Sequence, residues 1–126
     1  MLKRIIDAEY ADILTDSLIF RGKLRAFVED SSFIDVWFSL KISGRFSYHW
    51  ERRHIDGSMY RHDNFPDTNW QRVSTYPKHF HNGSQDAVEE SHIDESPVVG
   101  LRQFMEFVRS QLAKRTEDER TETTIY

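Results

Sequence analysis

The sequence contains no cysteine, so the chain can form no disulfide and offers neither a thiolate metal ligand nor a cysteine nucleophile. It has no apolar run long enough to cross a bilayer. Its first ten residues, MLKRIIDAEY, include acidic side chains and lack the apolar segment of a secretory signal. Phosphate-binding loops, GxSxG elbows, HExxH helices and dinucleotide-binding glycine motifs are also missing. We therefore expect a cytoplasmic protein that does not associate with membranes.

Charge is distributed unevenly along the chain, although the net charge of −4 is small. Residues 41–81 contain seven basic and four acidic side chains, a net charge of +3 before any histidine is protonated. Residues 84–96 contain five acidic side chains and no lysine or arginine. A basic centre of this kind can bind an anion, but the same pattern is typical of an ordinary solvated surface. Charge alone leaves the two interpretations open.

The spacing of apolar residues predicts an antiparallel sheet preceded by a helix. The chain of 126 residues is 38% hydrophobic, enough for one domain with one core. Residues 2–14 carry apolar side chains at helical spacing. Later segments alternate between apolar and polar residues, which is typical of half-buried strands, and Asp56-Gly57 is a hairpin signal. The strands are expected at residues 18–28, 33–42, 46–55 and 59–62, with a fifth at 75–81.

The last helix is marked by its beginning and by its apolar stripe. Ser96-Pro97 is typical of a helix start, and the stripe that follows, which runs to about Leu112, predicts core packing. The sequence thus predicts one α+β domain over residues 1–113. It consists of an N-terminal helix, an antiparallel meander of four to five strands and a C-terminal amphipathic helix packed on the sheet. Residues 114–126 are expected to form a charged, flexible tail.

Residues 48–81 contain five of the six histidines and two of the three tryptophans. Histidine has the unperturbed pKa closest to physiological pH, which suits it to proton transfer and metal binding. His79 and His81 are two residues apart on a predicted strand and therefore point to the same face. Two such imidazoles can share acid–base work or ligate a metal. Because the spacings typical of zinc sites are missing, we assign no metal and no cofactor.

Arg61 and Asp63 form a second pair with the same spacing. Arg61 can grip a phosphate through two parallel hydrogen bonds, and Asp63 can orient an imidazole. The alternative is a salt bridge at a strand end, followed by a turn that Asp63 begins. We expect this pair to lie close to His79 and His81. Further substrate-binding candidates, chosen by residue type and position, are Asn64, His49, Trp70, Lys78 and Arg72.

Four blocks in the middle of the chain give it a resemblance to a known family. They are FSYHW at 46–50, YRHDNFP at 60–66, TYPKHFHNG at 75–83 and VEES at 88–91. In this order, and followed by the last helix, they resemble the TumE-type family of toxin–antitoxin proteins from residue 18 to residue 112. The positions that match the family pattern are Arg61, Asp63, Asn64, Pro66, His79 and His81. The chain departs from the pattern at His62, where tryptophan is usual, at Asp67, where histidine is frequent, and at Lys78, which replaces a histidine.

The resemblance implies a toxin that acts on RNA or translation, together with an antitoxin partner. The first hypothesis is therefore a ribonuclease or translation inhibitor that needs no metal. His79 and His81 would transfer protons, Arg61 would bind the phosphate, and Asp63 would orient a histidine. The alternatives are a non-catalytic module that binds protein or nucleic acid, and a metal-dependent hydrolase that uses the histidine pair. The sequence does not decide whether the protein forms a homo-oligomer.

Overall fold

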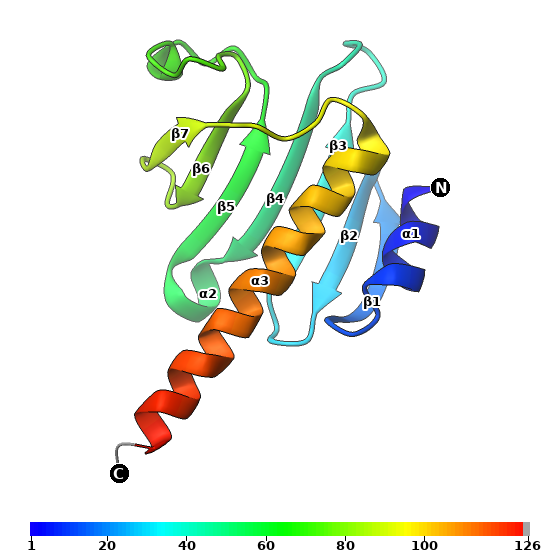
Figure 1. The fold of residues 1–126 in the computed structure, drawn as a ribbon. Coiled ribbons are helices and arrows are strands. Elements are labelled where there is room, and N and C mark those ends of the chain that lie inside the picture. The colour runs from blue at the N-terminus through cyan, green and yellow to red at the C-terminus, as the bar shows by residue number, and fades with distance from the viewer. Residues whose placement is uncertain (125–126) are drawn as a thin grey trace.

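The computed structural model describes residues 1–124 and contains one antiparallel sheet with helices on one of its faces (Figure 1). The strands lie side by side in the order in which they occur in the sequence. They are β1 (Leu14–Phe20), β2 (Lys23–Val28), β3 (Phe33–Phe38), β4 (Phe46–Arg52), β5 (Ser58–Asp63), β6 (His79–Gly83) and β7 (Val88–Glu90). The helices are α1 (Leu2–Glu9), the short α2 (Arg53–Asp56) and α3 (Pro97–Thr124), with a 3₁₀ turn, η1, at Thr68–Trp70.

This architecture confirms the predicted α+β class, but the predicted number of strands was too low. The segment expected as one strand at 18–28 belongs to a hairpin, in which β1 turns into β2 at Arg21 and Gly22. Both residues have positive φ values, 51° and 78°, which suit the two-residue turn of a hairpin. In the sequence, apolar residues keep the same spacing from Leu18 to Val28, so periodicity alone did not reveal the turn. In the structure, Phe20 pairs with Lys23, so Leu18 and Phe20 lie on the face opposite to Leu24 and are exposed.

Two other predicted boundaries were wrong for local reasons. The first helix ends at Glu9, and Leu14 already begins β1. The third strand ends at Phe38, because the Ser39 hydroxyl accepts hydrogen bonds from the backbone N–H groups of residues 41 and 42 and closes a turn. Leu40, which lies within the strand predicted at residues 33–42, is fully exposed. A polar side chain that binds the backbone thus overrides an alternating pattern.

The last strands and the long helix also differ in extent from the prediction. The strand expected at 75–81 is β6, which begins at His79, and β7 lies in the acidic segment, where no strand was predicted. Helix α3 begins at Pro97 as predicted and continues through Thr124. The flexible tail over 114–126 stays a prediction, and its residues 125–126 lie outside the described part of the chain. None of the helices within residues 1–124 has the length and apolar character to cross a membrane.

The core lies between the sheet and helices α1 and α3. Alternate side chains of the central strands, among them Tyr48 and Trp50, point toward α3 and are almost completely buried. Rings on α3 pack on them, with Phe104 centred 5.6 Å from Tyr48 and Phe107 centred 6.3 Å from Trp50. The intervening side chains of the same strands point away from the helices. The sheet therefore has one face that carries the core and one open face that carries polar groups.

Candidate functional site

The predicted catalytic residues lie on the open face of two neighbouring strands. In the register of β5 and β6, Asp63 pairs with His79, and Arg61 pairs with His81. Cross-strand partners have their side chains on the same face of a sheet. The antiparallel pairing therefore brings together two sequence blocks that are separated by the irregular segment from Asn64 to Lys78.

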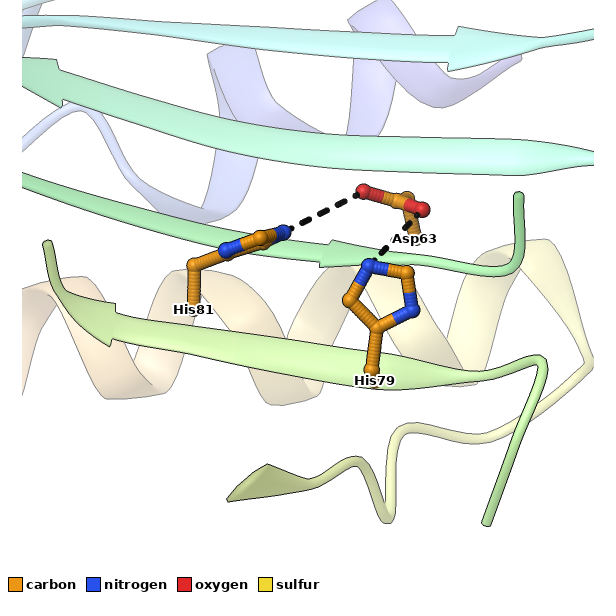
Figure 2. A group of neighbouring side chains, drawn as sticks. All are labelled: Asp63, His79 and His81. Carbon is orange, nitrogen blue, oxygen red and sulfur yellow. Dashed lines mark ion pairs between the residues drawn. The ribbon is translucent and has the colours of Figure 1, made fainter. Parts of the chain in front are cut away.

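Asp63 lies between the two histidines (Figure 2). The Nε2 atom of His79 is 3.3 Å from Oδ1 of Asp63, and the Nε2 atom of His81 is 3.9 Å from Oδ2. The three side chains are almost fully buried, with 1–3% of each residue exposed. We refer to Asp63, His79 and His81 as the His–Asp–His cluster.

The backbone fixes the orientation of both imidazoles. Nδ1 of His79 is 2.8 Å from the carbonyl oxygen of Pro77, and Nδ1 of His81 is 2.8 Å from the carbonyl oxygen of Gln85. A carbonyl oxygen only accepts hydrogen bonds, so we assign the proton to Nδ1 in both rings. In a neutral imidazole the Nε2 atom then carries a lone pair that points toward Asp63. Burial lowers the pKa of His81, although the carbonyl of Gln85 partly opposes this effect.

A cavity of about 270 Å³ opens beside the cluster. Trp70, on the η1 turn, lies over it, with its ring centred 5.8 Å from the ring of His81 and 6.4 Å from that of His79. Small-molecule sites in proteins are typically concave and combine aromatic walls with a few polar groups. The residues that line this cavity are Arg61, Asp63, Phe65, Asp67, Trp70, His79, His81 and Gln85.

Arg61 connects the cluster to a second group of polar side chains. Its Nε donates a hydrogen bond of 3.0 Å to Nδ1 of His49, whose Nε2 lies 3.1 Å from Oε1 of Glu51. Burial lowers the pKa of His49, and Glu51 partly opposes that shift. Hydrogen bonds from Arg53 lower the pKa of Glu51 to about 2. Glu51 is therefore ionised at neutral pH, and hydrogen bonds join the polar side chains on this side of Arg61.

A wider groove of about 480 Å³ continues along the open face from Arg61 toward β2. Phe65 and Arg61 line both the groove and the cavity, so the two spaces adjoin. Trp37 stacks on Phe65 with ring centroids 5.7 Å apart. The other residues that line the groove are Lys23, Arg25, Phe33, Asp35, Ser47, His49 and Glu51.

The structure places the other substrate-binding candidates in different surroundings. Trp70 and His49 line the cavity and the groove, respectively. Asn64 bonds to the backbone of Gly44 and Phe46 and so ties down the turn between β3 and β4. Nζ of Lys78 donates a hydrogen bond to the carbonyl oxygen of residue 93. Lys78 is not among the residues that line the cavity. Arg72 is exposed, with its guanidinium over the ring of Trp70.

The groove and its aromatic residues were not predicted from the sequence. Trp37 pairs with Ser47, and Asp35 pairs with His49, so all four side chains share the open face. The alternation in 33–42 contained this signal, because it places Asp35 and Trp37 opposite the buried side chains of that strand. Phe65 follows β5 in an irregular segment, and no periodicity indicates where such a side chain points.

The fold and the site define an α+β protein with a buried histidine–carboxylate cluster on the open face of an antiparallel sheet. The family model described as Toxin TumE matches residues 2–112. The chain therefore belongs to the TumE toxin family. No curated protein and no solved structure matches it.

Proposed function

We propose that this toxin cleaves RNA and that the scissile phosphate binds in the cavity beside the His–Asp–His cluster. The observation that carries the proposal is the presence of Arg61, Asp63, His79 and His81 in the wall of one cavity. A guanidinium binds phosphate oxygens, and the cluster supplies groups that can activate an attacking oxygen. As a member of a toxin family, the protein would act in the cytoplasm and be held inactive by an antitoxin.

The proposed reaction is an internal transfer within the RNA backbone. The 2′-oxygen attacks the neighbouring phosphorus and loses its proton at the cluster, while the bond from phosphorus to the 5′-oxygen breaks. A proton is returned to that 5′-oxygen, and the products are a 2′,3′-cyclic phosphate and a 5′-hydroxyl end. Arg61 would stabilise the negative charge that develops on the phosphate oxygens during this step.

The groove next to the cavity favours a single-stranded substrate. Trp37 and Phe65 offer aromatic faces, on which unpaired bases stack with a free energy of about 1–3 kcal/mol per base. Lys23 and Arg25 lie in the same groove, where both are paired with Asp35, and would turn part of this pairing toward the phosphate backbone. Single-stranded RNA can place a base in the groove and the next phosphate in the cavity, because the two spaces adjoin at Arg61 and Phe65.

The test is cleavage of an end-labelled single-stranded RNA by the purified chain, with the product ends identified. We expect His79→Gln and His81→Gln to lower the rate by roughly 10²- to 10⁴-fold, the usual contribution of a positioned acid–base group. His92→Gln is the matched control, because His92 is exposed and lines a hollow on the helical side of the sheet. Circular dichroism would establish that all variants are folded.

Two results would contradict this function. If the wild-type chain binds RNA but leaves it intact, and growth arrest in cells survives both histidine substitutions, the open face is a binding surface and not an active site. If protein synthesis stops in an extract whose RNA stays intact, the toxin inhibits translation by another route.

A further inference from the structure

We propose that the His–Asp–His cluster is a binding site for one divalent transition-metal ion, with Nε2 of His79, Nε2 of His81 and a carboxylate oxygen of Asp63 as its ligands. The ligand atoms of these three residues all lie within 4.8 Å of one another. Figure 2 shows both Nε2 atoms turned toward the carboxylate. The metal site itself does not depend on the proposed function. A role of the bound metal in catalysis rests on that function.

The distances within the cluster are longer than those of a close ion pair and are compatible with donor atoms around one metal ion. In a tetrahedral site with bonds of about 2.0 Å, donor atoms lie about 3.3 Å apart. The distances from the two Nε2 atoms to the carboxylate oxygens are 3.3 and 3.9 Å. A hydrogen bond between charged partners is typically about 2.7–2.9 Å long. Small movements of the side chains would bring all three donor atoms to bonding distance of one ion.

Each proposed ligand is held from behind by the backbone. The carbonyls of Pro77 and Gln85 accept from Nδ1 of the two histidines, and Oδ1 of Asp63 accepts from the backbone N–H of Phe65 at 3.0 Å. Metal-bound histidines almost always donate their second N–H to a carbonyl or carboxylate, and metal-bound carboxylates are themselves hydrogen-bonded. A histidine–aspartate ion pair needs no such support at all three groups.

The ligand set selects the kind of ion. Two imidazoles and one carboxylate suit zinc, iron, nickel and similar ions, whereas magnesium and calcium prefer all-oxygen sites. Three protein ligands beside a cavity leave a coordination position for water, which is typical of catalytic sites. A bound ion would lower the pKa of that water and would thus supply the group that takes the proton from the 2′-oxygen.

The experiment titrates the metal-free full chain with Zn²⁺ by calorimetry and with Co²⁺ by its visible ligand-field bands. We expect one ion per chain, with affinity more than about 100-fold lower in Asp63→Asn, His79→Gln and His81→Gln, since outer-shell partners alone contribute about 10- to 100-fold. His92→Gln should bind like the wild type. X-ray absorption of the wild-type zinc complex should show two imidazole nitrogens bound to the zinc. This measurement uses the wild-type protein alone and so does not depend on whether the variants fold.

Three results would overturn the proposal. The wild-type protein could bind neither ion, or the three substitutions could leave metal affinity unchanged. The third is a zinc complex whose X-ray absorption shows no imidazole ligands. Parallel RNA assays separate this proposal from the ribonuclease activity. Cleavage that EDTA does not affect, by protein without bound metal, would refute the role of the metal in catalysis and retain the ribonuclease. Specific metal binding without RNA cleavage would retain the site and refute the ribonuclease.

Discussion

Arg61 shows how the shape of a side chain, and not only its charge, determines what a site can bind. Its guanidinium is hydrogen-bonded to His49 through Nε and also lines the cavity. We expect Arg61→Lys to lower RNA cleavage by at least about tenfold, because an ammonium group cannot hold His49 and form two parallel bonds to phosphate at once. Rates at saturating RNA, together with melting temperatures, would check this. Arg102→Lys, at an exposed position of α3, is the control, and equal losses in the two variants would contradict the assignment.

Glu51 gives a prediction about stability and pH. Its pKa is about 2 in the folded protein, below the value of 4.5 for a free side chain, because Arg53 donates hydrogen bonds to it. A lowered pKa contributes stability that is complete above about pH 4.5 and disappears as the pH falls toward 2. Because Arg53 is largely exposed, we expect Glu51→Gln to lower the free energy of unfolding by only about 1–2 kcal/mol at pH 7.

Urea denaturation at several pH values would measure this difference between the wild type and Glu51→Gln. It should shrink steadily between pH 4.5 and pH 2. A difference that stays constant across this range would show that the lost stability has another origin than the ionised carboxylate.

Helix α3 approaches the sheet closely at Gly100. A Cβ atom added there would lie 2.6 Å from the hydroxyl of Tyr48 and 2.8 Å from the backbone oxygen of Asp94. Glycine to alanine usually stabilises a helix by about 1 kcal/mol. Here we expect Gly100→Ala to destabilise the protein by about 1–3 kcal/mol, because Tyr48 is buried and has little room to move.

Thermal or urea unfolding would test this prediction. Ser110→Ala, at an exposed position of the same helix, is the control and should be neutral or slightly stabilising. If Gly100→Ala matched Ser110→Ala, the contact between α3 and Tyr48 would be looser than the structure indicates.

The whole molecule places its core on one face of the sheet and the proposed RNA-binding groove on the other. Trp50 on β4 is completely buried beneath α3, whereas Trp37 on β3 lines the open groove. We expect Trp50→Ala to lower the free energy of unfolding by about 3–5 kcal/mol. Trp37→Ala should leave stability nearly unchanged but weaken binding of single-stranded RNA by roughly 5- to 100-fold, which corresponds to the loss of about 1–3 kcal/mol of stacking.

Chemical denaturation and fluorescence anisotropy with labelled RNA would measure these two quantities. Val99→Ala, at an exposed apolar position of α3, is the control for general loss of apolar surface and should affect neither. Equal RNA binding by the wild type and Trp37→Ala would exclude the groove as the path of the strand.

The sequence by itself determined the α+β class, the central strands and the start of the last helix. These follow from local periodicity and from helix-start signals, which depend only on neighbouring residues. It also determined that His79 and His81 share a face, because side chains two apart on a strand point the same way. The hairpin at Arg21 and Gly22 was hidden, since the spacing of apolar residues in the sequence is the same before and after it.

Only the tertiary structure decided what surrounds the two histidines. Asp63 lies sixteen residues before His79 in the sequence, and the register of β5 and β6 places it between the rings. The backbone carbonyls that orient the imidazoles belong to turns whose course no side-chain pattern encodes. A buried site depends on contacts between segments that are distant in the sequence. The strand register and the path of the loops set those contacts, and local propensity specifies neither of them.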